Sequence, residues 1–302
     1  MKTIELKSFD ETILHCTLWD EATNPKAVVQ LCHGMGEYAM KYDRFARYLN
    51  SQGYIVFADD HRGHGYTEDE KNRGHHDGFM FGDTLKDLLF IHKYLKEQYN
   101  LPQIFIGHSY GSFLGQAFYQ QSTDVKAVIL LGSAKIPNCL SAMGMAILYL
   151  LYLIKKDWRP KFINSVSDKL FNLKYKGEKG ACLWITRDNT RRQAFIEDPL
   201  CGVNMSVNFI FSMLKGIYQT NRKENTAKIN RNTPLAILSG DMDPIGGWGK
   251  KVIKLYKFYK KQGVKDLFFK LYPGARHELI NEINYEEVFN DINEFILKCL
   301  SK

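Results

Sequence analysis

The chain has 302 residues, of which 45% are hydrophobic, and it carries a formal net charge of +8. A chain of this length can bury one large α/β core or two modest ones. Its six cysteines are scattered without a C-x-x-C pair, which argues against a disulfide framework and against a zinc site. The basic residues are spread along the chain without a nucleic-acid-binding motif, so we expect no nucleic-acid partner.

Taken in chain order, the sequence alternates strand and helix patterns on both sides of one long interruption. Residues 1–7 contain no apolar segment and no small-residue cleavage site, so we expect no signal peptide and a cytoplasmic location. The first two strands should form an antiparallel edge, and nearly continuous apolar runs such as 27–32 indicate strands buried on both faces of a parallel sheet. The expected strands span 3–6, 13–19, 27–32, 53–58, 103–106, 125–131, 234–239 and 267–272. The expected helices span 41–52, 82–98, 112–121, 248–262 and 285–300.

This alternation predicts an α/β fold with a doubly wound, mostly parallel sheet. The alternation stops after Gly132 and resumes only at Pro234, which is far longer than an ordinary connection between a strand and a helix. We interpret this interruption as an inserted element. It contains a dense apolar run at 142–154 and helical patterns around Thr190 and at 205–217.

One pentapeptide, Gly107-His108-Ser109-Tyr110-Gly111, lies between a strand pattern and a helix pattern. A G-x-S-x-G sequence in this setting indicates a nucleophile elbow, in which a strained turn lifts the serine hydroxyl away from the sheet. The glycines allow the strand and the helix to approach closely. The pentapeptide alone also arises by chance, and the flanking strand and helix are what favour the elbow.

A serine nucleophile needs a base, and the base needs an acid that orients it. Two later strands end in suitable loops, because Asp241 and Asp243 follow the strand that ends near Ser239, and His277 follows the strand that ends at Tyr272. Ligands gather beyond the carboxyl ends of strands in doubly wound sheets. The chain order Ser, Asp, His is that of the α/β-hydrolases.

These motifs resemble α/β-hydrolases of the monoacylglycerol lipase and lysophospholipase group, over nearly the whole chain apart from the insertion. The matching segments are 33–37, 57–65, 107–111, Gly240 with Asp243, and 274–277. The family pattern places the acid three residues after Gly240, which selects Asp243 over Asp241, although both aspartates also suit a turn before Pro244. The resemblance implies that 1–133 and 231–302 form the core and that 134–230 form a mainly helical lid.

The chemistry of ester cleavage assigns roles to these residues. Ser109 attacks the carbonyl carbon, His277 takes and returns the proton, and Asp243 holds the imidazole. The oxyanion requires backbone N–H donors, and we expect them at Tyr110, directly after the nucleophile, and at Met35, in the turn after the third strand.

Several histidines invite a different interpretation, because imidazole and carboxylate groups are common metal ligands. No zincin motif or paired-ligand spacing is present, and the resemblance makes 61–65 a structural turn. We therefore expect no metal and no cofactor. The residues considered as ligands are His61, His64, His75, His76 and Asp77.

The apolar run at 142–154 is too short to span a bilayer, which needs about 20 apolar residues in a helix. It is expected to have no fully solvated face. Three interpretations remain: a core helix, a helix that touches a membrane, or a lid helix whose Leu150 and Leu153 line an acyl pocket. The basic residues of 155–161 would suit anionic headgroups, although such a flank can also be a solvated helix end. The family resemblance favours a lid, with transient membrane-surface contact as a further hypothesis.

We therefore predict a serine carboxylester hydrolase that acts through an acyl-enzyme on a small lipid-like ester, such as a monoacylglycerol or a lysophospholipid. One alternative is a serine aminopeptidase resembling proline iminopeptidase, which the basic insertion disfavours because such enzymes need acidic groups there. Epoxide hydrolases and haloalkane dehalogenases are disfavoured because position 109 is serine. A non-catalytic binding protein with the same fold is the remaining alternative.

Overall fold

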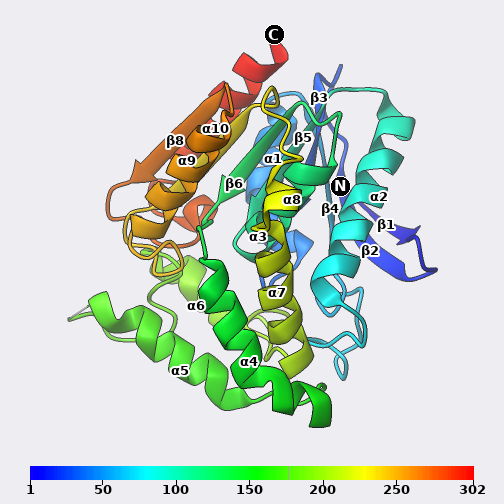
Figure 1. The fold of residues 1–302 in the computed structure, drawn as a ribbon. Helices are drawn as coiled ribbons and strands as arrows, with labels where there is room; N and C mark the ends of the chain where they lie inside the picture. The colour runs from blue at the N-terminus through cyan, green and yellow to red at the C-terminus, as the bar shows by residue number, and fades with distance from the viewer. Residues whose placement is uncertain (176) are drawn as a thin grey trace.

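The computed structural model describes residues 1–175 and 177–302, and in these residues it contains an eight-stranded sheet in the order β1-β2-β4-β3-β5-β6-β7-β8 (Figure 1). The pairs β1–β2 and β2–β4 are antiparallel, and every other neighbouring pair is parallel. The mostly parallel sheet and its antiparallel edge are therefore confirmed. The strands are β1 Lys2–Lys7, β2 Ile13–Trp19, β3 Ala27–Cys32, β4 Tyr54–Asp59, β5 Gln103–His108, β6 Ala127–Leu131, β7 Leu235–Gly240 and β8 Leu267–Tyr272.

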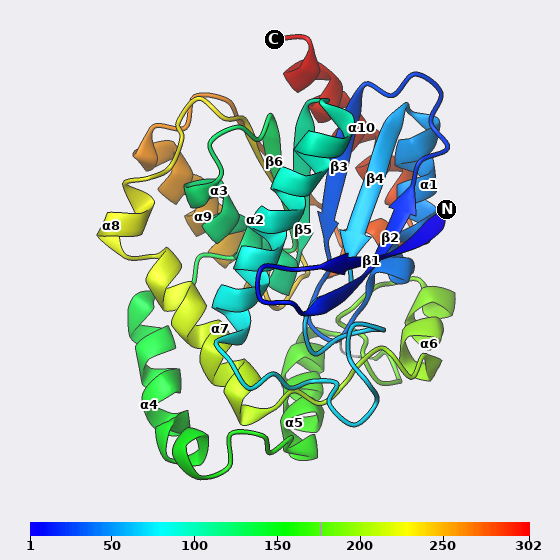
Figure 2. The same cartoon turned by 90° about the vertical axis from the view of Figure 1, so that its right-hand side faces the viewer.

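Helices cover both faces of the sheet, which explains why the central strands β3 to β7 are buried along their whole length (Figure 2). Helices α1 Asp43–Ser51 and α10 Tyr285–Leu300 pack against one face. Helices α2 Met80–Tyr99, α3 Tyr110–Gln121 and α9 Lys250–Gln262 pack against the other. Short 3₁₀ turns occur at η1 Ala39–Tyr42, η2 Asn172–Lys174 and η3 Leu279–Asn281.

The insertion between β6 and β7 lies beyond the carboxyl ends of the parallel strands (Figure 1). Its helices are α4 Asn138–Ile154, α5 Lys161–Phe171, α6 Asn189–Glu197, α7 Val207–Thr220 and α8 Lys223–Thr226. Helix α7 is anchored to the core, because its Phe209 and Ile217 belong to the same hydrophobic cluster as residues of α2 and α3. Helix α4 packs on α7, where Tyr152 stacks on Phe211 with ring centroids 4.3 Å apart.

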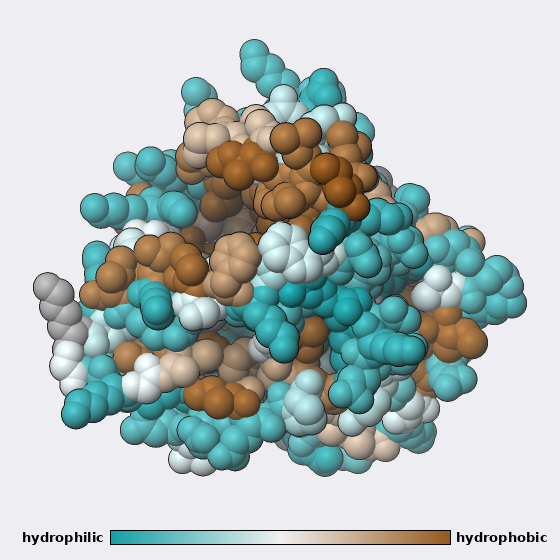
Figure 3. All heavy atoms as spheres, turned by 90° about the horizontal axis from the view of Figure 1, so that it is seen from below, coloured by the Kyte–Doolittle hydropathy of each residue, from teal (hydrophilic) through white to brown (hydrophobic). Residues whose placement is uncertain are grey.

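The outer side of α4 is uncovered, so the expectation that it would have no solvated face is wrong. Ile147, Leu150 and Ile154 are 71%, 69% and 75% exposed, because α7 covers only one side of the helix. Leu153 is also exposed. The interpretation in which Leu150 and Leu153 line an acyl pocket therefore does not match the structure, in which neither side chain lines a closed pocket. Seen from below, hydrophobic side chains gather in patches on this face of the molecule (Figure 3). Among the described residues, no helix is both long and apolar enough to cross a membrane.

Candidate active site

Ser109 lies between the end of β5 and the start of α3, in a backbone conformation that side-chain-bearing residues rarely adopt (φ 52°, ψ −117°). The turn is tight because α3 begins directly against the end of β3. A methyl group added at Gly111 would lie 2.2 Å from the carbonyl oxygen of Cys32. The geometry is that of a nucleophile elbow, with the glycine where the close approach requires it.

His277 and Asp243 lie together in the loops that follow β8 and β7. The Nδ1 of His277 is 3.0 Å from Oδ2 of Asp243, and both side chains are buried. The remaining carboxylate oxygen of Asp243 accepts the backbone N–H of Ile245 at 2.8 Å. Burial alone would lower the pKa of His277, but the charge and hydrogen bond of Asp243 raise this pKa above its ordinary value.

Asp241 occupies a different position in the same loop. Its Oδ1 accepts the backbone N–H of Gly274 at 2.7 Å, which ties the β7 loop to the β8 loop. The structure therefore brings Asp243, and not Asp241, to the imidazole of His277.

Ser109 and His277 are neighbours through the end of β6. The backbone N–H of Ser109 donates to the carbonyl oxygen of Leu131 at 3.0 Å, and a methyl group added at the next residue, Gly132, would lie 3.0 Å from Cε1 of His277. Within the described residues, no hydrogen bond joins the Ser109 hydroxyl to the imidazole. Such bonds are often long in ligand-free sites and shorten in the substrate complex.

The two expected oxyanion donors lie beside the serine. Tyr110 begins α3, so its N–H has no partner within the helix. A methyl group added at Gly34 would lie 3.1 Å from Cβ of Ser109, so the turn that contains Met35 lies next to this serine. In the described part of the chain, neither backbone N–H donates a hydrogen bond.

The histidines considered as metal ligands have other roles in the fold. The Nε2 of His33 accepts the backbone N–H of His61 at 2.9 Å, so its Nδ1–H donates to the Gly34 carbonyl at 2.7 Å, in the turn that contains Met35. His61 and His64 are buried, and burial lowers their pKa values to about 4, which keeps both neutral. The side chains of His75 and His76 contact Ser206 and Asp83, respectively.

A buried charged cluster beside the serine was not expected from the sequence. Lys41 bonds to Glu278 and lies 3.5 Å from Glu37, and Tyr42 donates to Glu37 at 2.8 Å. Burial would raise the pKa of Glu37, but the charge of Lys41 holds it below its ordinary value, so Glu37 remains ionised. A methyl group added at Gly34 would lie 2.9 Å from Oε1 of Glu37 and 3.1 Å from Cβ of Ser109, so this carboxylate lies close to Ser109.

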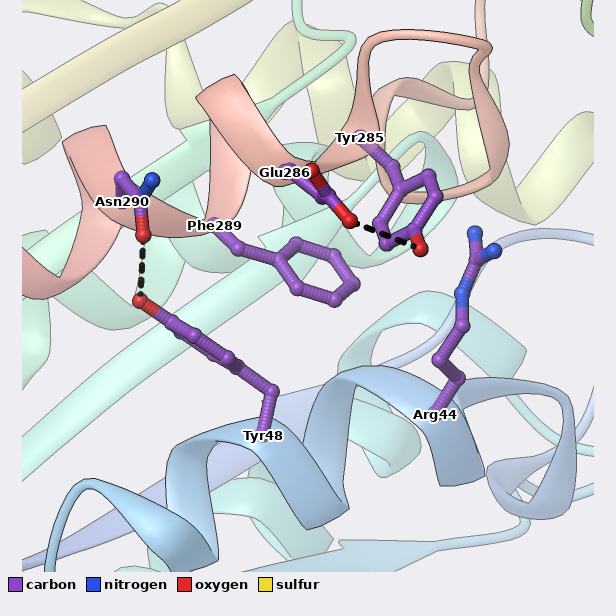
Figure 4. Close-up of a pocket in the computed structure, with 6 residues that line it drawn as sticks. All are labelled: Arg44, Tyr48, Tyr285, Glu286, Phe289 and Asn290. Carbon is purple, nitrogen blue, oxygen red and sulfur yellow. Dashed lines mark hydrogen bonds between the residues drawn. The ribbon is translucent and has the colours of Figure 1, made fainter.

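A separate hollow of about 370 Å³ lies between α1 and α10 and contains none of the predicted site residues (Figure 4). The Arg44 guanidinium stacks 3.7 Å from the ring centre of Tyr285 and donates to the carbonyl oxygen of Ile280. Tyr48 donates to Asn290 at 2.9 Å. These contacts join the two helices, and we assign this hollow no catalytic role.

The sheet order, the serine elbow and the loops at the strand ends define the α/β-hydrolase fold. The family model described as serine aminopeptidase, S33, matches residues 23–284 of the chain. The chain therefore belongs to this family, and within it to the monoacylglycerol lipase group of serine hydrolases of the carboxylesterase and lipase type.

Relatives cover nearly the whole chain. Human monoglyceride lipase is 26% identical over 298 residues, which are 96% of this chain and 89% of the human protein. The monoglyceride lipase homolog of monkeypox virus is 27% identical over 288 residues, covering 93% of this chain and 92% of its own. The monoacylglycerol lipase of Mycolicibacterium smegmatis is 25% identical over 289 residues, with 94% and 92% coverage.

Solved structures match the fold along its whole length. A lipase in an open form superposes with a TM-score of 0.87 at 23% identity, covering 100% of this chain and 99% of the other. A soluble variant of monoglyceride lipase from Saccharomyces cerevisiae gives a TM-score of 0.74 at 22% identity, covering 99% and 96%.

Proposed function

We propose that the protein hydrolyses monoacylglycerols, with Ser109 as nucleophile, His277 as general base and Asp243 as the acid that orients it. The observation that carries this proposal is the buried hydrogen bond between His277 and Asp243, beside a serine held in an elbow turn. The related lipases from a mammal, a virus and a bacterium support the choice of an acylglycerol.

In the proposed mechanism, the Ser109 oxygen attacks the ester carbonyl carbon while Nε2 of His277 takes the hydroxyl proton. The negative charge that forms on the carbonyl oxygen is stabilised by the N–H groups of Met35 and Tyr110. The intermediate collapses to an acyl-enzyme, and His277 gives its proton to the departing glycerol oxygen. Water then attacks the acyl-enzyme with the same base, which releases a fatty acid and restores Ser109.

The charged cluster supports a leaving group that carries several hydroxyls. Glu37 can accept hydrogen bonds from hydroxyl groups near Ser109, whereas Lys41 can donate them. A glycerol leaving group fits this chemistry.

The exposed surface of the lid supports contact with a lipid aggregate, where long-chain monoacylglycerols reside. We define the outer lid face as seven of the exposed apolar residues of α4 and α5, namely Ile147, Leu150, Leu153, Ile154, Phe162, Val166 and Leu170. The segment 134–230 has 16 lysines and arginines against 7 aspartates and glutamates, which favours an anionic surface. We therefore propose that 134–230 act as a lid and that the protein binds membranes peripherally from the cytoplasm.

A hydrolysis panel tests the substrate. Long-chain monoacylglycerols should give the highest kcat/KM, ahead of lysophospholipids, short p-nitrophenyl esters and prolyl amides. A preference for lysophospholipids would change the headgroup assignment. A preference for prolyl amides would support an aminopeptidase instead, and no turnover of any ester by folded protein would favour a binding protein.

A further inference from the structure

The loop that carries His277 is held by the insertion as well as by the core. The backbone N–H groups of His277 and Glu278 donate to the carbonyl oxygens of Trp184 and Ile185 at 3.2 and 2.8 Å. The buried guanidinium of Arg276 donates to the carbonyl oxygen of Leu183 at 2.6 Å. Three consecutive residues of the loop therefore depend on the segment that follows α5 and η2.

Within this segment, the indole of Trp184 lies against the imidazole of His277. The ring centroids are 5.2 Å apart and the rings are inclined by 42°. Phe171 packs against the same indole, with centroids 5.1 Å apart in an edge arrangement. The indole is therefore held between the end of α5 and the imidazole.

Asp168 of α5 fixes the polar edge of the indole. Its Oδ1 accepts the Nε1–H of Trp184 at 3.1 Å and the backbone N–H of Cys182 at 2.9 Å. Its Oδ2 accepts a hydrogen bond from the side-chain amide of Asn172 at 3.0 Å, so three hydrogen bonds fix the carboxylate. With 3.6 residues per turn, Asp168 lies roughly opposite the exposed stripe of Phe162, Val166 and Leu170 on α5. The helix that carries part of the outer lid face thus also anchors the indole beside the base.

We propose that Trp184, anchored by Asp168, is a positioning residue for His277 and links the lid to the catalytic base. Fixed packing against the indole restricts rotation of the imidazole away from Ser109. The centre of the indole ring, 5.2 Å from that of the imidazole, also lies within the distance, about 6 Å, at which an aromatic ring stabilises a neighbouring cation, here the imidazolium that forms when His277 takes the proton. This inference rests on the proposed function, because it takes His277 as the base.

The effect of the indole must be separated from that of the other groups around the imidazole. Replacing Trp184 with leucine keeps an apolar side chain against His277 but removes the aromatic ring. The pKa of His277 should therefore fall, although the carboxylates that raise this pKa remain. The titratable groups that face His277 are Asp243 from the β7 loop, His108 from β5, Glu37 from the β3 loop and Glu278 from its own loop.

The test compares three variants on a soluble short ester, p-nitrophenyl butyrate, so that lipid binding does not contribute. Trp184→Leu should lower kcat roughly tenfold with little change in KM, as expected when a catalytic group is misplaced. It should also move the acid limb of kcat/KM to lower pH by about half a unit. Trp184→Phe keeps a π face but no N–H group, so it should lower kcat without moving the limb. Asp168→Ala should behave like Trp184→Phe, because both substitutions remove the hydrogen bond between Asp168 and the side chain of residue 184.

Two variants in the same insertion serve as matched controls and should keep wild-type kcat. Trp158→Leu removes a tryptophan that lies elsewhere in the lid, where it contacts Phe162. Asp157→Ala removes an exposed aspartate whose side chain forms no hydrogen bond or ion pair with any described residue. A loss in these controls equal to that of Trp184→Leu would mean a general effect of lid mutations and would overturn the inference.

The outcomes separate this inference from the proposed function. If Ser109→Ala is inactive while Trp184→Leu keeps wild-type kcat and an unshifted acid limb, the positioning role is wrong and the proposed function stands. If Ser109→Ala retains turnover, the proposed function itself is wrong. Should Trp184→Leu melt below the assay temperature, Trp184→Phe and Asp168→Ala decide the question, and wild-type kcat in both overturns the inference.

Discussion

The hydroxyl of Ser109 is the group on which the proposed chemistry depends. Ser109→Ala should reduce ester hydrolysis to near background with an unchanged melting temperature, because removing a serine nucleophile costs about 10⁶ in kcat. His277→Ala should have a similar effect. Steady-state kinetics on a monoacylglycerol and a thermal melt are the measurements, and substantial residual turnover in folded Ser109→Ala would contradict the assignment.

Asp241 and Asp243 lie in the same loop after β7, so the effects of their asparagine variants on kcat can be compared directly. Asp243→Asn should reduce kcat by about 10⁴, because the amide no longer holds the imidazole in the tautomer that accepts the serine proton. Asp241→Asn keeps an oxygen that can accept the N–H of Gly274 and should change kcat little. If Asp241→Asn is the more damaging variant, the acid has been assigned wrongly.

The pH dependence follows from the environment of His277. Asp243 raises the pKa of His277 above its ordinary value of about 6.5, so a larger fraction of the base is protonated near neutral pH. The kcat/KM of the wild type should therefore rise with pH, with a midpoint above 6.5. A profile that is flat from pH 5 to 8 would be incompatible with a histidine base.

Individual site residues differ in how far the sequence predicts them. Ser109 and His277 follow from a local motif, the chain order and the positions of loops after strands, whereas the choice of Asp243 over Asp241 comes from the family resemblance. The structure brings Asp243 to His277 beside Ser109, and the catalytic roles of the three residues remain predictions. Lys41, Glu278 and Trp184 could not be predicted in this way. Their places depend on contacts between segments far apart in the chain, for which a single sequence gives no periodic signal.

At the scale of elements, the outer lid face can be tested separately from the catalytic residues. Leu150→Ser and Leu153→Ser should each weaken binding to anionic phospholipid vesicles roughly tenfold, since burying a leucine contributes about 1.5–3 kcal/mol. Hydrolysis of a soluble short ester should be unchanged, because both side chains point to solvent. Vesicle co-sedimentation measures the binding.

The matched control for the lid is Ile13→Ser on β2, which removes an exposed apolar side chain of the sheet edge, outside the lid. It should leave vesicle binding unchanged. Equal binding by the leucine variants and the wild type would remove the proposed role of α4 at the membrane surface.

The elements of the core could be predicted closely because buried parallel strands have continuous apolar runs and the flanking helices have regular apolar spacing. Helix α5 was missed, since it follows Pro160 and contains Ser165, Val166, Ser167 and Asp168, which have weak helix propensity. The exposure of α4 was also missed. Its sequence is apolar on all sides, and only the packing on α7 decides which side faces solvent.

In the molecule as a whole, the core and the insertion have different roles in the proposed mechanism. The loops at the carboxyl ends of β3, β5, β7 and β8 supply the reacting groups. The insertion supplies an apolar and basic outer surface, and through Trp184 it also contacts His277, the proposed base. Asp168 and Phe171 of α5 contact Trp184, so the exposed helix α5 and His277 share one neighbour.

The central claim is that Ser109 is an activated nucleophile in a monoacylglycerol site. Its most direct test is intact-mass and peptide analysis after treatment with a long-chain alkyl fluorophosphonate, with and without competing 1-oleoylglycerol. We predict one adduct per chain, located on Ser109, that forms more slowly in the presence of 1-oleoylglycerol and is absent from Ser109→Ala and His277→Ala. An unlabelled folded protein, an adduct on another residue, or labelling that 1-oleoylglycerol does not slow would contradict this account.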